Sequence, residues 1–444
     1  MKMSENKTNL VYGINDKPAF GQIVLFAIQQ LLAIMAATIA VPAIIGNGMS
    51  ASAALFGAGI GSIVYLLITK GKSPVFLGSS FAFIGSMFTA FGSAAAVSIG
   101  YAGLIIGAVI AGLVYVIIAI VVKFCGVKWI DKLMPAVVIG PTVAIIGLSL
   151  AGNAIGDLMT SSVEGGSSYV ALICGLVALA VTMLVSTYGS KMMKLIPFII
   201  GILAGYLCAS IFSLIGKASG NSALCVIDYS ALKNMNSILS LPEFSFLKAD
   251  WSGINGSYLL TLFVAYAPVA FVVFAEHLAD HKNLSSIVGT NLLEDPGLTR
   301  TLLGDGIGSM LGAFFGGCPN TTYGESIACV AITRNASTIS IWGAAIAAIL
   351  FSLVTPLVAF LETVPSCVMG GVCVALYGFI ASSGFKMFQK VDLNKNCNLF
   401  TACVIFIVGV GGMTLTFGQV EIRTVACALI LGILTHVMLS KEKD

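Results

Sequence analysis

The chain has 444 residues, of which 58% are apolar and only 9% are charged, and its formal net charge is +3. Soluble domains carry about 25% charged and 45–50% apolar residues, so this composition excludes soluble enzymes, nucleic-acid binders and disordered scaffolds. A helix needs roughly 20 apolar residues to cross a bilayer, and the chain has room for about 12–14 such crossings. We therefore expect an all-α integral membrane protein.

Fourteen hydrophobic runs, bounded by charges or by Gly, Pro and Asn, are candidate membrane spans. Runs three and ten are short, and each opens at a proline followed by small hydroxyl residues. The runs cover residues 20–44, 50–69, 74–93, 98–122, 129–151, 167–188, 193–215, 257–280, 297–317, 319–333, 338–361, 365–384, 397–416 and 420–440.

The basic residues test this count, because Lys and Arg concentrate on the cytoplasmic side of membrane proteins. With a cytoplasmic N-terminus and fourteen spans, 18 of the 22 Lys and Arg residues fall inside. Omitting one early span would invert every later loop and remove this bias. We predict fourteen spans, two cytoplasmic termini and an external loop at about 216–256. The basic residues left outside are Lys217, Lys233, Lys248 and Arg423.

The fourteen spans divide into two halves of seven, and an odd repeat unit inserts its second copy upside down. Spans three and ten then occupy equivalent positions, and each has two small hydroxyl residues before an aromatic one, at 79–81 (SSF) and 321–323 (TTY). Such paired broken segments are the best sequence pointer to the central site of a transporter. N–H groups at a helix start within the membrane lack partners and can bind a ligand oxygen. Two short or re-entrant helices without a ligand are the alternative.

Few carboxylates fall well within the spans, where a charge costs about 2.5–3.5 kcal/mol on insertion scales. Glu276 and Asp280 lie four residues apart and share a helix face, so one of these two like charges is expected to bind a proton. Alternatively, Asp280 caps the cytoplasmic end of its helix beside His281. Glu325 follows the break in span ten, where it could accept a hydrogen bond from a ligand N–H group. The alternative for Glu325 is a first-turn acid stabilised by the helix dipole.

Other polar residues in the spans are expected to be structural. His277 and His281 are four residues apart, but there is no HExxH motif, so we expect no metal site and no cofactor. We expect His277 to be hydrogen-bonded within the protein and Asp305 to pair with a neighbouring helix. The 11 cysteines show no CxxC spacing and predict no disulfide framework. Residues 1–18 are polar and do not form a signal peptide.

The motifs at these positions resemble those of the nucleobase–ascorbate transporter family of nucleobase–cation symporters, and within it the bacterial uracil permeases. The resemblance covers nearly the whole chain, and its most specific motif is residues 319–325 (PNTTYGE). The other matching pieces are Gln29, 78–83 (GSSFAF), 275–277 (AEH), 294–298 (EDPGL), 331–334 (AITR), 368–371 (VMGG) and 376–378 (LYG).

The resemblance implies fourteen spans in a 7+7 inverted repeat, with short antiparallel strands in spans three and ten. It also implies a core domain made of spans 1–4 and 8–11 and a gate domain made of spans 5–7 and 12–14. The chain would then divide into a cytoplasmic segment (1–18), the first half of the core (19–125), the first half of the gate (126–216), an external loop (217–256), the second half of the core (257–363) and the second half of the gate with the cytoplasmic tail (364–444).

The resemblance places the substrate between these domains near mid-membrane. By resemblance, Glu276 and Glu325 contact a nucleobase, and Phe81 and Gly324 offer backbone N–H groups to its carbonyls. The other implied contacts are Ser80 and Tyr323 in the pocket and Tyr377 from the gate. Uracil suits this set, because it is flat and neutral with two N–H donors and two carbonyl acceptors.

Purine-transporting members of the family usually have Gln at the position of Glu325, which favours a pyrimidine here. Three positions depart from the uracil permease pattern. Asp280 stands where many of these permeases carry His, with His281 one residue later. Gln30 follows Gln29 where others have Gln-His, and Ser326 stands where Asn is common.

We therefore expect a non-enzymatic transporter that imports uracil across the bacterial plasma membrane by proton symport and alternating access. The groups expected to couple the proton are Glu276, Asp280 and His281. Transport of xanthine or thymine, coupling to sodium and, remotely, a channel are the alternatives left open. The resemblance is compatible with a homodimer, and nothing indicates a nucleic-acid partner.

Overall fold

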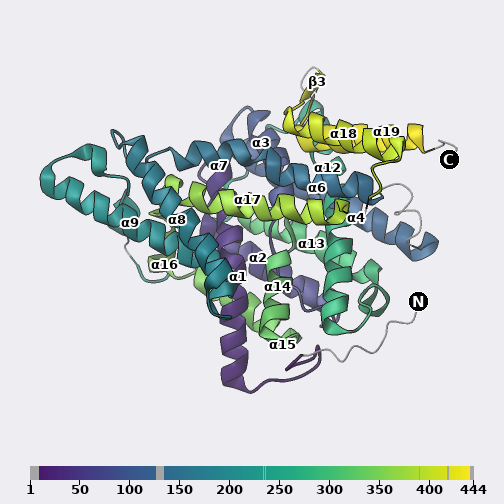
Figure 1. Cartoon of the computed structure of the whole chain (residues 1–444), viewed down its shortest axis with the longest axis horizontal. Helices are drawn as coiled ribbons and strands as arrows, with labels where there is room; N and C mark the ends of the chain where they lie inside the picture. The colour runs from purple at the N-terminus through teal and green to yellow at the C-terminus, as the bar shows by residue number, and fades with distance from the viewer. Residues whose placement is uncertain are drawn as a thin grey trace.

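The computed structural model describes residues 10–126, 135–233, 235, 237–389, 391–417 and 420–440, and these are mostly helical (Figure 1). In this part of the chain, eight helices are long and apolar enough to cross a membrane. They are α1 (Phe20–Ile45), α2 (Ala51–Ile68), α4 (Val97–Cys125), α6 with α7 (Ala136–Ser149 and Ala151–Leu158), α8 (Ser168–Tyr188), α9 (Pro197–Ser219), α12 (Gly256–Val288) and α17 (Ser366–Phe388).

Each of the remaining predicted runs also contains a helix, but these helices are shorter or less apolar. They are η1 with α3 (Phe81–Phe83 and Ile84–Gly92), α13 (Leu298–Gly316), α14 (Gly324–Thr333), α15 (Thr338–Ser352), α18 (Asn396–Val410) and α19 (Thr424–Leu439). The connecting elements are η2 (Met193–Leu195), η3 (Ser222–Leu224), α10 (Ser230–Lys233), α11 (Ser245–Lys248), η4 (Leu293–Gly297), α16 (Thr355–Glu362) and the hairpin strands β3 (Leu415–Phe417) and β4 (Val420–Ile422).

The end of α12 differs from the sequence prediction, and the predicted start of the fifth run lies outside the described residues. Helix α12 continues to Val288, so Asp280 lies well inside the helix and the interpretation of Asp280 as its cap is wrong. The fifth predicted run starts at 129, but 127–134 lie outside the described residues and α6 begins at Ala136, directly after Pro135. Proline suits a helix start because its missing N–H would have no partner there.

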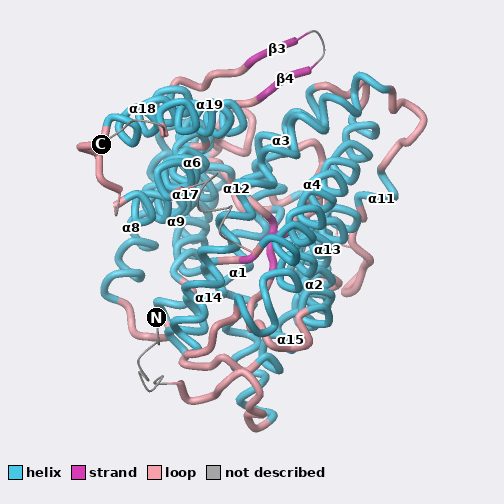
Figure 2. Tube along the Cα trace, turned by 90° about the vertical axis from the view of Figure 1, so that its right-hand side faces the viewer, coloured by secondary structure: helices cyan, strands magenta, loops and turns pink. Residues whose placement is uncertain are grey.

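The two broken segments meet inside the molecule. Strand β1 (Leu77–Ser79) pairs antiparallel with β2 (Asn320–Thr322), with Gly78 opposite Thr321. Figure 2 shows this pair between the surrounding helices, and both strands are buried. Because each strand is followed at once by a helix, the starts of η1 and α14 are brought to the same depth of the protein.

Close glycine contacts position the strand pair. Helix α2 carries Gly57 and Gly61, and α13 carries Gly308 and Gly312, so each helix has the GxxxG spacing that lets helices approach closely in membranes. A Cβ atom at Gly57 would lie 2.7 Å from the carbonyl oxygen of Gly312. The side chain of Asn320 lies against this contact and donates from Nδ2 to the Gly57 carbonyl at 2.9 Å. Strand β2 is thereby fixed to the α2–α13 pair.

The helices form two sets that pack mainly within themselves. In the first set, α13 packs against α2 and α4, α12 against α4, and α15 against α1 and α2. In the second set, α17 packs against α6, α7 and α8, and α18 and α19 pack against each other and on α6. Figure 1 shows α6 and α17 side by side. We call these the α1–α4/α12–α15 set and the α6–α9/α17–α19 set.

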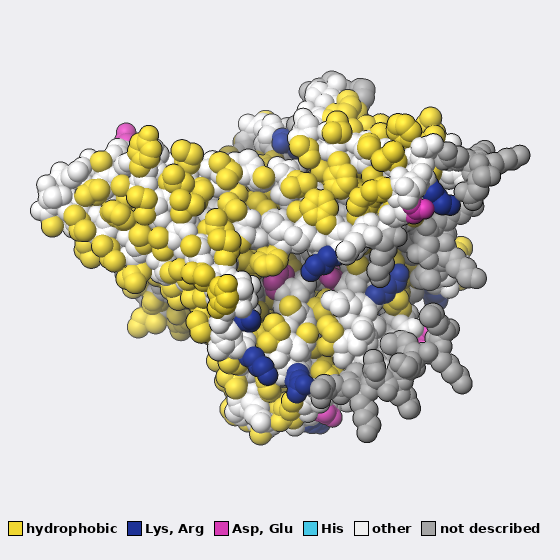
Figure 3. Space-filling model, in the orientation of Figure 1, with side chains coloured by type: hydrophobic (Ala, Val, Ile, Leu, Met, Phe, Trp, Pro, Cys, Tyr) yellow, Lys and Arg dark blue, Asp and Glu magenta, His cyan; other side chains and the backbone are white. Residues whose placement is uncertain are grey.

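The outer surface is largely apolar. Leu203, Leu207 and Leu214 on α9 are each at least 49% exposed, and Figure 3 shows many apolar side chains spread over the face in view. A soluble monomer rarely exposes such continuous apolar area, whereas lipid-facing helices do. The protein is therefore a multi-pass membrane protein.

Candidate functional site

Three neighbouring cavities lie where the two helix sets face each other. The central one is small, about 50 Å³, and is lined by residues of both broken segments, by Glu276 of α12, and by Ile146 and Ile380. It shares Glu276, Glu325 and Ile380 with a cavity of about 370 Å³. It shares Phe81 and Ile146 with a third cavity, of about 350 Å³.

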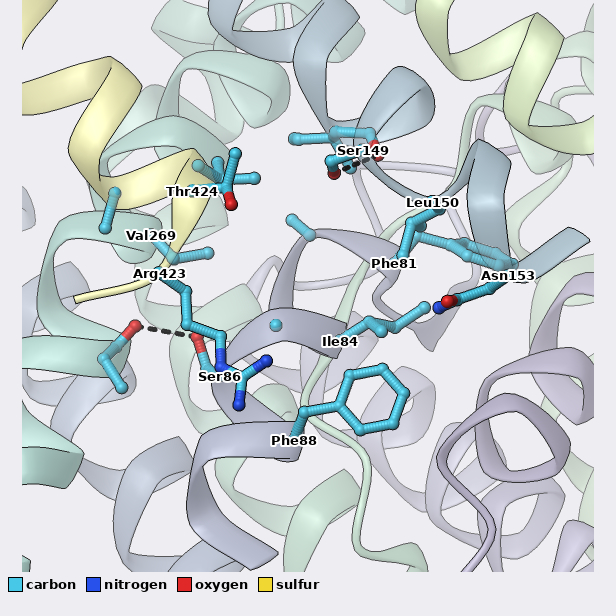
Figure 4. Close-up of a pocket in the computed structure, with 16 residues that line it drawn as sticks. Phe81, Ile84, Ser86, Phe88, Ser149, Leu150, Asn153, Val269, Arg423 and Thr424 are labelled. Atoms are coloured by element: carbon cyan, nitrogen blue, oxygen red, sulfur yellow. Dashed lines mark hydrogen bonds between the residues drawn. The ribbon is translucent and has the colours of Figure 1, made fainter. Parts of the chain in front are cut away.

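The third cavity has none of the three carboxylates Glu276, Asp280 and Glu325 among its lining residues. Figure 4 shows the side chain of Arg423 in this cavity, near Ser86 and Phe88. Its Nε atom donates to Thr89 Oγ1 at 2.8 Å, which joins the start of α19 to α3. This hydrogen bond therefore connects the two helix sets.

The strand-to-helix breaks present backbone groups to the central cavity. Ser80 and Tyr323 have extended backbones, and the helices start at Phe81 and Gly324. The first N–H groups of a helix have no partner within the helix and can bind a ligand oxygen. A Cβ at Gly324 would meet nothing within 4 Å, so there is open space in front of this backbone.

The carboxylates face the largest cavity. Glu276, Asp280 and Glu325 all line it, and all three residues are half-buried. Within the described part of the chain, neither Glu276 nor Glu325 has a hydrogen bond or ion pair to another side chain, whereas Asp280 accepts one from Thr322 Oγ1 at 2.9 Å. Two carboxylates are thus available to accept hydrogen bonds from a ligand, and Asp280 is tied to β2.

The predicted aromatic residues have different surroundings. Tyr323 is among the lining residues of the central cavity, and its hydroxyl donates to the Ser79 carbonyl at 2.6 Å, which joins the second break to β1. Tyr377 is buried against Phe81, with ring centroids 5.9 Å apart in an edge-to-face arrangement, and is not among the lining residues of the three cavities. Ser80 lines the central cavity, and its N–H donates to the Pro319 carbonyl at 2.9 Å.

His281 is fully buried and lines none of these cavities. Its Nε2 lies 2.8 Å from the Tyr65 hydroxyl, and its Nδ1 lies 2.9 Å from the His277 carbonyl. His277 in turn lies 3.0 Å from Thr301 Oγ1 and 3.0 Å from Asp305 Oδ2, both on α13. These residues form a polar network between α12 and its neighbours, behind the carboxylates that line the cavity.

Two of the positions that depart from the uracil permease pattern are in contact. Gln30 on α1 donates from Nε2 to the carbonyl and the hydroxyl of Ser326 on α14, at 3.2 and 3.3 Å. The Ser326 hydroxyl also accepts from the Phe76 N–H at 3.0 Å. The two residues therefore form one hydrogen-bonded unit that joins α1 to both broken segments.

Sequence reasoning missed several residues that line the cavities. Ile146 and Ile380 lie in mainly apolar runs, where no signal distinguishes them from lipid-facing residues. Lys194 and Lys386 line the largest cavity, and the sequence assigned them only to the cytoplasmic side. Figure 3 shows acidic side chains in a hollow, with Lys or Arg side chains nearby. Among the described residues, no group of three His, Cys, Asp or Glu side chains could hold a metal ion.

Comparisons with known proteins agree with this architecture. A family model described as "Permease family" matches residues 21–417. The uracil permease of Bacillus caldolyticus is 37% identical, with 97% of this chain and 94% of that protein covered. The uracil permease of Bacillus subtilis (strain 168) is 37% identical, covering 100% and 98%. That of Escherichia coli (strain K12) is 36% identical, covering 96% and 93%.

Solved structures of more distant proteins share the fold. The transmembrane domain of the cyanobacterial bicarbonate transporter BicA superposes with a TM-score of 0.64 at 16% identity, covering 96% of this chain and all of that one. The murine anion transporter Slc26a9 in its inward-facing state gives a TM-score of 0.66 at 12% identity, covering 96% of this chain and 69% of that one. The family match over most of the chain, together with the sequence motifs, shows that the chain belongs to this permease family, the nucleobase–ascorbate transporters.

Proposed function

We propose that this protein imports uracil by secondary active transport. The observation that carries the proposal is the similarity, at 36–37% identity and over nearly the full length, to three proteins named uracil permease. The chemistry of the cavity supports the same substrate, because it combines carboxylate acceptors with backbone donors and has no excess of basic groups at its centre.

In the proposed complex, each polar atom of uracil meets a complementary group. Glu276 and Glu325 accept hydrogen bonds from its N–H groups, and such charge-assisted bonds are among the strongest in proteins. The N–H groups of Phe81 and Gly324 donate to its carbonyls. Tyr323 and Ser80 complete the walls, and Tyr377 supports the ring of Phe81.

The transport cycle we propose is alternating access. The α1–α4/α12–α15 set acts as the core domain and the α6–α9/α17–α19 set as the gate domain, and they move against each other around the site. The 370 Å³ cavity that contains the three carboxylates is bordered by Lys194 and Lys386, which the charge pattern assigns to the cytoplasm, so we propose that the carboxylates are reached from the cytoplasmic side in this conformation. Thr89 and Arg423 then join the outer ends of the two domains.

We propose a topology of fourteen spans in a 7+7 inverted repeat, with both termini on the cytoplasmic side of the bacterial plasma membrane. It is supported by a helix in each predicted run and by the distribution of Lys and Arg. A reporter active only outside the cytoplasm is expected to work when fused within 220–225 and to fail when fused after 440. The reverse result would overturn the topology.

We propose a proton as the coupling ion, carried by Glu276 or by the Glu276/Asp280 pair. Both line the cavity, and within the described part of the chain neither forms an ion pair with a basic side chain. His281 would influence this pair only through the buried network around it. Replacing sodium with choline during uptake is expected to leave the rate unchanged, and a loss of uptake would indicate sodium coupling instead.

The direct test of the substrate is uptake of labelled uracil by cells that lack their own uracil transporter and produce this protein. We expect saturable uptake that excess unlabelled uracil abolishes and that xanthine does not. Stronger competition by xanthine or thymine than by uracil would contradict the assignment. Recovery of unmodified uracil from the cells checks that uptake involves no chemical conversion.

A further inference from the structure

The two helix sets contribute different chemistry to the central cavity. The α1–α4/α12–α15 set supplies both carboxylates, the hydroxyl groups and the exposed backbone of the two breaks. The α6–α9/α17–α19 set supplies two side chains, Ile146 of α6 and Ile380 of α17. The wall from the first set therefore carries the polar groups, beside Phe81 and Ala82, and the wall from the second set is made of two isoleucines.

These isoleucines stand on backbones that are held closely together. A Cβ atom at Gly147, next to Ile146, would lie 2.3 Å from the Tyr377 carbonyl oxygen on α17. One end of the same helix pair is equally tight, because a Cβ at Gly384 would lie 2.5 Å from the Gly140 carbonyl oxygen. Isoleucine is also stiff about χ1. The apolar wall can therefore yield little without moving α6 or α17.

The shape of uracil matches this division. Its four heteroatoms occupy N1, the C2 carbonyl, N3 and the C4 carbonyl, which leaves C5 and C6 as one continuous apolar edge. If the polar atoms face Glu276, Glu325 and the backbone N–H groups, the C5–C6 edge faces the isoleucines. A substituent on that edge would press against isoleucine side chains whose helices are held closely together, and overpacking of this kind is unfavourable.

We propose that Ile146 and Ile380 determine specificity by excluding pyrimidines that carry a substituent at C5 or C6. The inference rests on the proposed function, since it assumes uracil as the substrate. A single methyl group in an apolar pocket typically changes the specificity ratio about 10–200-fold. Thymine (5-methyluracil) and 6-methyluracil are therefore expected to compete at least about ten times more weakly than uracil itself.

The experiment measures how strongly uracil, thymine and 6-methyluracil inhibit uptake of labelled uracil by the wild type, Ile146→Val, Ile146→Ala, Ile380→Val and Ile380→Ala. We expect each truncation to Ala to lower the discrimination against at least one methylated base by about fivefold or more, with Val intermediate. The KM for uracil itself should change less, because the polar contacts remain. Membrane abundance and thermal stability of each variant show whether it has folded.

The chain offers matched controls. Ile332 lines only the 370 Å³ cavity and Ile84 only the 350 Å³ cavity, so Ile332→Ala and Ile84→Ala remove the same atoms outside the central site. Both should retain the wild-type discrimination. The proposed role of Ile146 and Ile380 is disproved if Ile146→Ala and Ile380→Ala fold and discriminate against both methylated bases as strongly as the wild type does. Failure of the wild type to transport uracil would instead overturn the proposed function, so the two failures are distinguishable.

Discussion

Glu276 and Glu325 line cavities inside a membrane protein, and neither has a hydrogen bond or ion pair to another side chain among the described residues. Since a charge within the bilayer is costly, such residues are retained where a ligand or a proton uses them. Asp280 differs, because Thr322 already donates to it. We therefore assign the substrate contacts to the two glutamates.

Replacing either glutamate by glutamine tests this assignment. Glu276→Gln and Glu325→Gln keep the size of the side chain but exchange a charged acceptor for a neutral amide. Hydrogen bonds to charged groups contribute about 1.5–3 kcal/mol, so each change should weaken uracil binding by roughly 10–150-fold. Titration calorimetry on the purified protein measures the Kd. The exposed Glu164→Gln is the control, and equal binding by all three variants would refute the assignment.

Tyr323 has a structural task that can be separated from substrate contact. Its hydroxyl donates to the Ser79 carbonyl, and losing a buried hydrogen bond of this kind costs roughly 1–3 kcal/mol. We expect Tyr323→Phe to lower the thermal midpoint in detergent by about 1–4 °C. Tyr229→Phe, in the loop before α12, should leave the midpoint unchanged. A wild-type midpoint in Tyr323→Phe would show that the bond does not hold the two breaks together.

The intramembrane carboxylates could be found from the sequence because a charge stands out in an apolar run. Ile146 and Ile380 could not, because one apolar residue among many carries no sign of which way it points. Tyr377 illustrates the same limit, since the rotation of α17 decides whether its ring contacts a ligand or Phe81. These outcomes depend on packing between helices that lie far apart in the chain.

At the scale of elements, the two broken segments are anchored by the α2–α13 glycine contact. The GxxxG spacing is visible in the sequence, but the partner helix is not, and neither is the role of Asn320 between them. The end of α12 was also misplaced, because its last two turns are polar and the hydrophobic run ends earlier than the helix. Hydrophobicity locates the apolar part of a span, whereas the helix itself continues as long as its backbone bonds are satisfied.

Gly312→Ala tests the anchoring role. The added Cβ would lie 2.3 Å from the Asn320 side chain, so β2 or α13 must shift. Overpacking costs about 1–3 kcal/mol, which should lower the thermal midpoint by about 1–4 °C and reduce uracil uptake. Gly21→Ala on α1 has open space around it and serves as the control. If both variants behave like the wild type, the contact does not position the site.

In the whole molecule, alternating access requires the two helix sets to move relative to each other. A disulfide between cysteines introduced by Thr89→Cys and Arg423→Cys would join α3 to the start of α19. We expect its formation on oxidation to reduce the rate of uracil uptake more than about tenfold. The cysteine pairs should be introduced into a protein in which the exposed Cys125 and Cys403 are replaced by Ser. Reductant should restore uptake, because the cross-link blocks motion rather than damaging the protein.

The control cross-link joins two residues of one helix set. Ser86 donates to the Ala265 carbonyl at 2.7 Å, and both belong to the α1–α4/α12–α15 set. Oxidation of the Ser86→Cys/Ala265→Cys pair should leave uptake largely unchanged. If both cross-links inhibit uptake equally, or if neither inhibits it, the division into a core and a gate is contradicted.

The central claim is uphill transport of uracil driven by a proton gradient. Purified protein in proteoliposomes, with labelled uracil outside and an imposed pH gradient that is acidic outside, tests it most directly. The account predicts that uracil accumulates inside above its external concentration and that a protonophore abolishes the accumulation. Equilibration of uracil without accumulation under the same gradient, or no uptake at all, would contradict it.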